Sequence, residues 1–267
     1  MARAIYGGLL DGGFTATSLS VVDPSAAAQE NAHQAGIEQV FDSAPDEALS
    51  ADLILLAIKP QITKAALQPL AGRLGPNSVV LSIVAGINAE SLASLLGLSD
   101  AGRIIRCMPN TPALVGEGMT GLYAKTEAGS AEGKALAERV MSSVGQCLWV
   151  ESESDLDVIT AISGSGPAYF FLFIESLTDA AIALGMQSES ARKLALQTAL
   201  GASRLASLSS EDAATLRKNV TSAGGTTEQA IQTFEASDIR GIVAQATQAA
   251  ARRSLELSKE FGAWTAH

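Results

Sequence analysis

The chain has 267 residues, of which 47% are hydrophobic and 17% are charged, a composition typical of a folded globular protein and unlike that of a disordered chain. At roughly 100–200 residues per domain, this length predicts two domains. The formal net charge of −10 argues against a nucleic acid or an anionic membrane surface as a partner. The most apolar run, at 170–174, is followed by Glu175 and Asp179, so it falls far short of the roughly 20 residues that span a bilayer.

The two cysteines, Cys107 and Cys147, lie in or beside apolar segments that resemble strands. They lack the CxxC spacing of metal or redox sites, so we expect buried structural thiols and no metal. With no secretory signal pattern in the first residues, the sequence predicts a cytoplasmic protein.

The first half of the chain alternates between helical and strand patterns. Residues 1–10 predict a helix, 19–22 a strand, and the segment after Ser25 a helix that this serine caps, through about residue 34. Continuous apolar runs at 52–58, 78–84 and 103–107 predict strands buried on both faces, as in a parallel sheet. Further helices are expected at 63–70, 89–96 and 130–143, and a last strand at 146–150. This alternation predicts a doubly wound α/β domain over residues 1–151.

Small or polar clusters follow the predicted strands at their carboxyl ends. They are Asp23-Pro24, Lys59-Pro60, Ala85-Gly86 and the group Pro109, Asn110 and Thr111. Each cluster could be an ordinary turn. Their recurrence predicts a ligand site, because ligands of open α/β sheets bind at the carboxyl ends of the strands.

The second half, residues 152–267, predicts only helices, at 156–162, 167–184, 188–207, 211–220, 226–234 and 237–261. Residues 163–166 (SGSG) predict a flexible polar turn, and Pro167 suits the first turn of the next helix. Because every residue from 169 to 174 is apolar, that helix is expected to be surrounded by protein on all sides. The last helix carries one apolar stripe, which fits either packing within the chain or a subunit interface. Its residues are Ile239, Val243, Ala246, Ala250, Leu257 and Phe261.

A second candidate site lies between two of these helices, at 219–228 (NVTSAGGTTE). Hydroxyl groups and glycines gather there at the start of a helix, where backbone N–H groups have no intrahelical partner and can bind a carboxylate or phosphate. The alternative is a simple capping turn, with Thr226 or Gly225 as the N-cap and Glu228 in the first turn. The two histidines, His33 and His267, lie far from it in sequence, which argues against a serine hydrolase and against a dehydrogenase with a histidine acid.

Five motifs resemble those of the pyrroline-5-carboxylate reductases. They are AIKP at 57–60, SIVAG at 82–86, RCMPNTP at 106–112, ISGSGPAY at 162–169 and VTSAGGTT at 220–227. Each is modest alone, but five in this order and spacing, over nearly the whole chain, are highly specific.

The resemblance implies a Rossmann-type NAD(P)H domain, a helical domain that forms a homodimer, and assembly into rings of dimers, which is common in the family. The reaction would transfer a hydride to C5 of 1-pyrroline-5-carboxylate and give L-proline, the last step of proline biosynthesis. By resemblance, the dinucleotide would be lined by Ala57, Ile58, Lys59, Pro60 and Ala85. Asn110 and Thr111 would lie near the nicotinamide, with Asn110 also close to the substrate. The substrate would be held by Ser222, Thr226 and Thr227 of the partner subunit, with the Thr227 hydroxyl as the catalytic hydrogen-bond partner of the imine nitrogen.

The cofactor can be NADPH or NADH. Asp23 could accept a hydrogen bond from a ribose 2′-hydroxyl, which favours NADH, whereas Ser25 could contact a 2′-phosphate. The family leans towards NADPH.

The sequence departs from the family pattern at its start, where relatives have a strand and a Gly-x-Gly-Asn-Met-type loop. Loss of that strand would leave a gap between the strands at 19–22 and 52–58. We therefore expect either a longer natural protein or weak cofactor binding. Two smaller departures are Ala44, where many relatives have asparagine, and Ala223, where proline is frequent.

Two other functions remain open from the sequence. Without the glycine loop, the chain could be a non-catalytic oligomerising remnant. It could also reduce a related cyclic imine, although the Gly-Gly-Thr-Thr loop argues against that.

Overall fold

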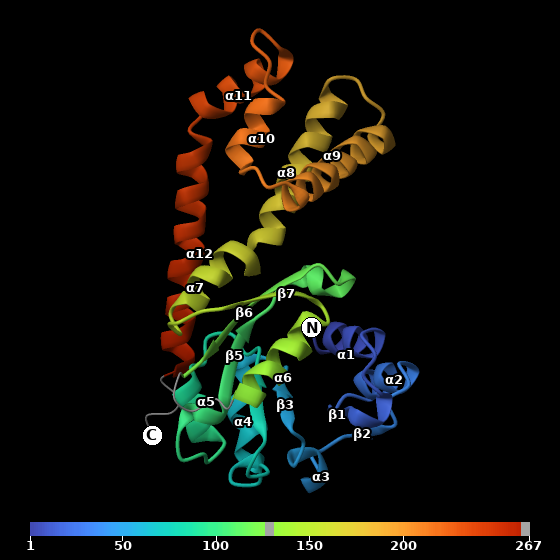
Figure 1. Cartoon of the computed structure of the whole chain (residues 1–267), viewed down its shortest axis with the longest axis vertical. Coiled ribbons are helices and arrows are strands. Elements are labelled where there is room, and N and C mark those ends of the chain that lie inside the picture. Colours follow the sequence, from blue (N-terminus) through green and yellow to red (C-terminus); the bar gives the residue numbers. More distant parts are fainter. Residues whose placement is uncertain (126–130, 263–267) are drawn as a thin grey trace. The chain divides into compact units, whose positions relative to one another are not determined.

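The computed structural model describes residues 1–125 and 131–262. They form two compact units (Figure 1): Met1–Ser165 together with the chain from Ala250 onward, and Gly166–Ala249. The first unit combines strands and helices, and the second is helical. An α/β domain followed by an all-helical one is the fold class that the sequence predicts. Ser130, the first residue of one expected helix, and the C-terminal His267 lie outside the described residues.

The elements of the first unit follow the expected alternation. Its helices are α1 (Ala2–Asp11), α2 (Ala26–Gln34), α3 (Asp46–Leu49), α4 (Thr63–Leu67), α5 (Ala89–Leu95), α6 (Ala131–Ser142) and α7 (Asp155–Ile159). Its strands are β1 (Ser20–Val22), β2 (Gln39–Phe41), β3 (Leu53–Leu56), β4 (Val79–Ser82), β5 (Ile104–Met108), β6 (Gly118–Ala124) and β7 (Gly145–Trp149). The sequence patterns did not reveal β2, α3 or β6.

The strands form two separate sheets. β1 and β2 make a parallel pair, while the larger sheet has the order β3-β4-β5-β6-β7. Within it, β3, β4 and β5 are parallel, β6 runs antiparallel to β5, and β7 is parallel to β6. In the described part of the chain no strand joins β1 to β3, which is the gap expected between them.

Glycines explain why β6 escaped detection. A Cβ atom on Gly118 would lie 2.7 Å from the Val144 carbonyl oxygen, and one on Gly121 would overlap the Ile159 side chain. These positions need glycine for close packing, and glycine weakens the strand signal in a sequence.

Strands β4 and β5 of the larger sheet are buried on both faces, as their continuous apolar runs predict. Leu81 and Ile105 pack with α1 and α6 on one face, whereas Val80 and Ile104 pack with α4 and α5 on the other. These neighbours alternate because successive side chains of a strand point to opposite faces. The result is a closed aliphatic core that holds the carboxyl ends of the strands in place.

The segment at 163–166 is not the flexible turn that its composition predicts. A π-helical turn, Thr160–Gly164, follows α7 directly and leads into α8 (Gly166–Ala183), with Pro167 in the first turn of α8 as expected. The turn packs closely on β5, since a Cβ atom on Gly164 would lie 2.8 Å from the Met108 methyl carbon. Contacts with the sheet therefore override the local preference of glycine and serine for a loop.

The second unit contains α8, α9 (Ser188–Leu208), α10 (Ala213–Asn219), α11 (Thr226–Ala236) and the first part of α12 (Ile239–Gly262). Helices α8 and α9 pack against each other, and the buried side chains of α9 are Ala191 and Ala195. The rings of Phe173 and Phe234 meet with their centroids 6.2 Å apart.

The apolar run of α8 is not surrounded by its own chain, contrary to expectation. Phe170 and Phe171 are each 64% exposed, and Leu172 is 63% exposed. The helical stretch Asp155–Ala183 is long and apolar enough to cross a membrane, judged by length and composition alone. Only 11% of its most apolar 18-residue segment is buried. A lone stretch of this kind is a weak indication of a membrane, because a helix buried in a protein interior passes the same test.

The end of α12 belongs to the first unit, from Ala250 onward. The Ser254 hydroxyl bonds the Asp157 carboxylate over 2.5 Å. Gly86 has a left-handed φ of +75°, and a Cβ atom there would lie 2.9 Å from a ring carbon of Phe261. Leu257 and Phe261 therefore pack within the chain, whereas Val243 on the same stripe is 55% exposed.

Candidate active site

The carboxyl end of β1 carries Asp23 and Ser25. One carboxylate oxygen of Asp23 accepts a hydrogen bond from the Ser25 backbone N–H at 2.8 Å, and the Asp23 N–H donates to the Phe41 carbonyl. The Asp23 carbonyl accepts from the Gln29 side chain at the start of α2. This turn fixes a carboxylate and a hydroxyl where the ribose of a dinucleotide is expected.

The end of β3 forms a locked turn over Ala57, Ile58, Lys59 and Pro60. The Lys59 carbonyl accepts from the Ile62 N–H at 3.2 Å and from the hydroxyl of Thr63, which is fully buried, at 3.1 Å. The side chain of Lys59 is exposed, while Ala57 and Ile58 are half-buried. The turn thus presents small and aliphatic groups beside one exposed cation.

The end of β4 lies next to that turn, because β3 and β4 are paired in parallel. The Ser82 hydroxyl accepts from the Val84 N–H at 3.2 Å. Ala85 then projects a small exposed side chain. These contacts place Ala85 and the β3 turn on the same edge of the sheet.

The end of β5 supplies Asn110 and Thr111 on this edge. Asn110 is only 8% exposed, and both polar atoms of its side chain bond backbone groups: Oδ1 accepts from the Met119 N–H at 2.9 Å and Nδ2 donates to the Ser163 carbonyl at 3.0 Å. Thr111 is exposed.

An ion pair that the sequence did not reveal lies beside these loops. Arg106 of β5 meets the Glu153 carboxylate at 3.1 Å, and the same carboxylate oxygen accepts from the Ala89 N–H at the start of α5. Arg106 Nε is buried and has no hydrogen-bond partner among the described residues. An arginine inside an apolar strand, and acidic residues after β7, are each a sign in the sequence of an ion pair. Arg106 and Glu153 are 47 residues apart, however, so local patterns do not show that they pair.

The second unit carries the other candidate residues, Ser222, Thr226 and Thr227, around the start of α11. The Gly225 N–H donates to the Ser222 carbonyl at 3.0 Å, and a Cβ atom on Gly225 would lie 2.6 Å from the Ser222 hydroxyl. Gly225 is the N-cap, and no side chain caps the helix. The Glu228 carboxylate accepts from the Gly224 N–H at 2.8 Å. Ser222 and Thr226 are exposed and Thr227 is half-buried, so the tip presents hydroxyl groups beside first-turn amides.

Other reactive groups are poorly suited to catalysis. Burial raises the pKa of the Cys107 thiol far above its ordinary value, so it stays protonated. His33 bonds the Ile37 carbonyl at 3.1 Å, on the helix-to-strand turn after α2. Residues 1–125 and 131–262 contain no group of three or more histidine, cysteine or acidic side chains able to hold a metal ion.

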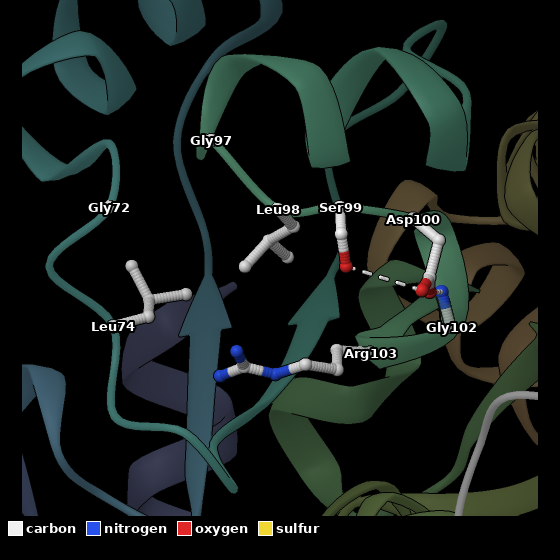
Figure 2. A pocket seen from close by; sticks show the side chains of 8 residues that line it. All are labelled: Gly72, Leu74, Gly97, Leu98, Ser99, Asp100, Gly102 and Arg103. Atoms are coloured by element: carbon white, nitrogen blue, oxygen red, sulfur yellow. Dashed lines mark hydrogen bonds between the residues drawn. The ribbon is translucent and has the colours of Figure 1, made fainter.

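A cavity of about 580 Å³ lies elsewhere in the first unit (Figure 2). It is lined by Gly72, Leu74, Gly97, Leu98, Ser99, Asp100, Gly102 and Arg103. Figure 2 shows the Arg103 guanidinium below the side chains of Leu74 and Leu98. Arg103 directly precedes β5, so this cavity lies at the amino ends of the strands, and none of the predicted site residues lines it.

These features define a class of protein. Parallel strands β3, β4 and β5 that end in ligand-type loops, followed by a helical unit, are typical of a Rossmann-type oxidoreductase. Residues 1–86 match the family model "NADP oxidoreductase coenzyme F420-dependent", and residues 153–257 match "Pyrroline-5-carboxylate reductase dimerisation".

Individual relatives define the family. Pyrroline-5-carboxylate reductase of Pseudomonas aeruginosa is 43% identical over 264 residues, which cover 98% of this chain and 95% of that protein. The solved structure of the Coxiella burnetii pyrroline-5-carboxylate reductase superposes with a TM-score of 0.90 at 39% identity, over 96% of this chain and 94% of that one. The Plasmodium falciparum enzyme, solved with NADP bound, gives 0.81 at 29% identity over 96% and 93%. The chain belongs to the pyrroline-5-carboxylate reductase family.

Proposed function

We propose that this chain reduces 1-pyrroline-5-carboxylate to L-proline with NADPH or NADH, the last step of proline biosynthesis, in the cytoplasm. The observation that carries the proposal is the 43% identity to a pyrroline-5-carboxylate reductase over 98% of the chain. The loops at the carboxyl edge of the sheet and the hydroxyl-rich tip of α11 supply the two kinds of binding group that this reaction needs.

The first unit fits a dinucleotide. The Asp23 carboxylate suits a ribose 2′-hydroxyl, and Ser25 suits a 2′-phosphate. The small side chains of Ala57 and Ala85 leave room for a ligand at the edge of the sheet, beside Ile58, Lys59 and Pro60. Asn110 and Thr111 then lie on the nicotinamide side. When bound, the dinucleotide supplies the hydride.

The second unit fits a small carboxylate. Ser222 and Thr226 offer hydroxyl donors, and the uncapped first turn of α11 offers amide donors and the positive end of the helix dipole. A cyclic imino acid carries one carboxylate, which these groups hold and orient.

The Thr227 hydroxyl binds the ring nitrogen. An imine accepts hydride most readily when its nitrogen is protonated, and a cyclic imine takes that proton from water. The chain therefore contributes orientation and a hydrogen bond and needs little acid catalysis, which accounts for a site without histidine.

A second copy of the chain covers the exposed side chains of α8. An apolar face of this kind marks a protein–protein contact, and the family model matched there describes dimerisation. We propose a homodimer in which each substrate tip serves the partner's nucleotide domain, and in which dimers assemble further into rings.

The test is a steady-state assay of nicotinamide oxidation with 1-pyrroline-5-carboxylate, with proline identified as the product. We expect turnover with this substrate to exceed that with piperideine-6-carboxylate. Preference for the six-membered imine would assign a related reductase. Assembly without turnover, and without quenching of NADPH fluorescence, would identify a non-catalytic remnant.

A further inference from the structure

Asn110 joins three segments of the first unit through one buried amide. Its Oδ1 accepts from the Met119 N–H of β6, and its Nδ2 donates to the Ser163 carbonyl of the π-helical turn. A carboxamide is the side chain that offers one acceptor and one donor in this shape, because aspartate lacks the donor. Its 8% exposure makes both bonds costly to lose.

The same junction is closely packed on either side of Asn110. A Cβ atom on Gly164 would lie 2.8 Å from the Met108 methyl, which would have to move aside, and one on Gly121 would overlap the Ile159 side chain. Isolated π-helical turns in proteins occur frequently at functional sites. Here the turn contains Ser163, and the first unit ends at Ser165.

We infer that Asn110 is a positioning residue for the reduction, acting without contact with cofactor or substrate. It holds the backbone of Asn110 and Thr111, where the nicotinamide is expected, against the π-helical turn. Both polar atoms of its side chain bond the backbone, and the residue is only 8% exposed, so little of the amide is accessible to a ligand. The inference rests on the proposed function.

The decisive variant is Asn110→Asp. Aspartate keeps an acceptor for the Met119 N–H but places an oxygen against the Ser163 carbonyl. We expect kcat to fall about 10–100-fold, because a misplacement of about 1 Å costs up to about 100-fold in rate. The Kd for NADPH and the KM for 1-pyrroline-5-carboxylate should stay within about threefold. The primary isotope effect with nicotinamide-deuterated NADPH should rise, since hydride transfer becomes slower than the other steps.

Asn88→Asp is the matched control. The Asn88 oxygen accepts from the Ser91 N–H at 2.7 Å as the N-cap of α5, and aspartate caps equally well, so kcat should not change. Gly121→Ala disturbs the same junction without touching Asn110, because its Cβ atom would overlap the Ile159 side chain, and it should reproduce the fall in kcat if Asn110→Asp does not fold.

Two outcomes would overturn the inference. A rise of tenfold or more in the Kd for NADPH or in the KM would make Asn110 a ligand contact. Loss of thermal stability with unchanged kcat would make its role purely structural. Failure of the proposed function is a separate result, because the unmodified chain would then show no turnover.

Discussion

The two units differ in how completely they bury their own apolar surface. The first packs aliphatic side chains on both faces of its larger sheet, with Leu81, Ile104 and Leu122 fully buried. In the second, the buried hydrophobic side chains are the two alanines Ala191 and Ala195, while phenylalanines and leucines of α8 and α9 are exposed. The first unit therefore encloses most of its apolar side chains, whereas the second leaves many of its own exposed. The proposed dimer would therefore bury apolar surface mainly in the second unit.

The largest effect on this difference between the two units is expected from a charged side chain in the apolar run of α8. Phe171→Asp would place a carboxylate in the proposed subunit interface, at a cost of several kcal/mol. We expect the dimer Kd to rise at least about 100-fold, since each 1.4 kcal/mol is tenfold. Analytical ultracentrifugation over a dilution series measures this.

Leu148→Asp on β7 is the matched control, because Leu148 is 50% exposed and belongs to the first unit. It should leave assembly unchanged. A Phe171→Asp variant that dimerised like the unmodified chain would mean that α8 is not the covered surface.

The next test asks what the second unit contributes to the chemistry. Thr227→Ala removes the hydroxyl oxygen proposed to accept a hydrogen bond from the protonated imine nitrogen. A hydrogen bond to a charged group contributes about 1.5–3 kcal/mol, so kcat/KM should fall about 10–100-fold. Thr227→Ser keeps the hydroxyl and should retain most of the activity. An unchanged kcat/KM in the alanine variant would remove Thr227 from the mechanism.

A smaller effect tests whether the first unit is held by its own polar contacts. Glu153→Ala leaves the Arg106 guanidinium and the Ala89 N–H without their carboxylate partner. Both side chains are mostly buried, with 13% and 28% exposure, so we expect a loss of about 1–3 kcal/mol in the free energy of unfolding. Urea denaturation measures this.

Glu90→Gln provides the comparison for that experiment. It breaks the ion pair with Lys125, in which both side chains are more than half exposed, and should change stability far less. Equal midpoints for the two variants would contradict an anchoring role for Glu153.

The smallest expected effect is on the labelling rates of the two cysteines. Both lie in the first unit, so their labelling measures whether that unit stays folded. Burial raises the pKa of both thiols, and most strongly that of Cys107. A raised pKa keeps a thiol protonated as the pH increases, so at about pH 8 a disulfide reagent should label Cys147 slowly and Cys107 only on unfolding. The same protection of Cys107 is expected in Phe171→Asp. Rapid labelling of Cys107 there would show that the first unit also depends on assembly.

Local patterns in the sequence were sufficient to predict much of this protein. Continuous apolar runs identify β3, β4 and β5 because a strand covered on both faces has no polar positions. The motifs at 57–60, 82–86, 106–112 and 220–227 identify the family, and the hydroxyl-rich loop does lie at the start of α11. These features depend on residues that are neighbours in the chain.

Contacts between distant residues were decided only by the tertiary structure. The glycines of β6 are explained by Val144 and Ile159, the π-helical turn by packing on Met108, and the two bonds of Asn110 by Met119 and Ser163. The apolar run at 169–174 shows the same division: its composition requires a protein environment, but hydrophobicity has no direction and does not specify which chain supplies that environment.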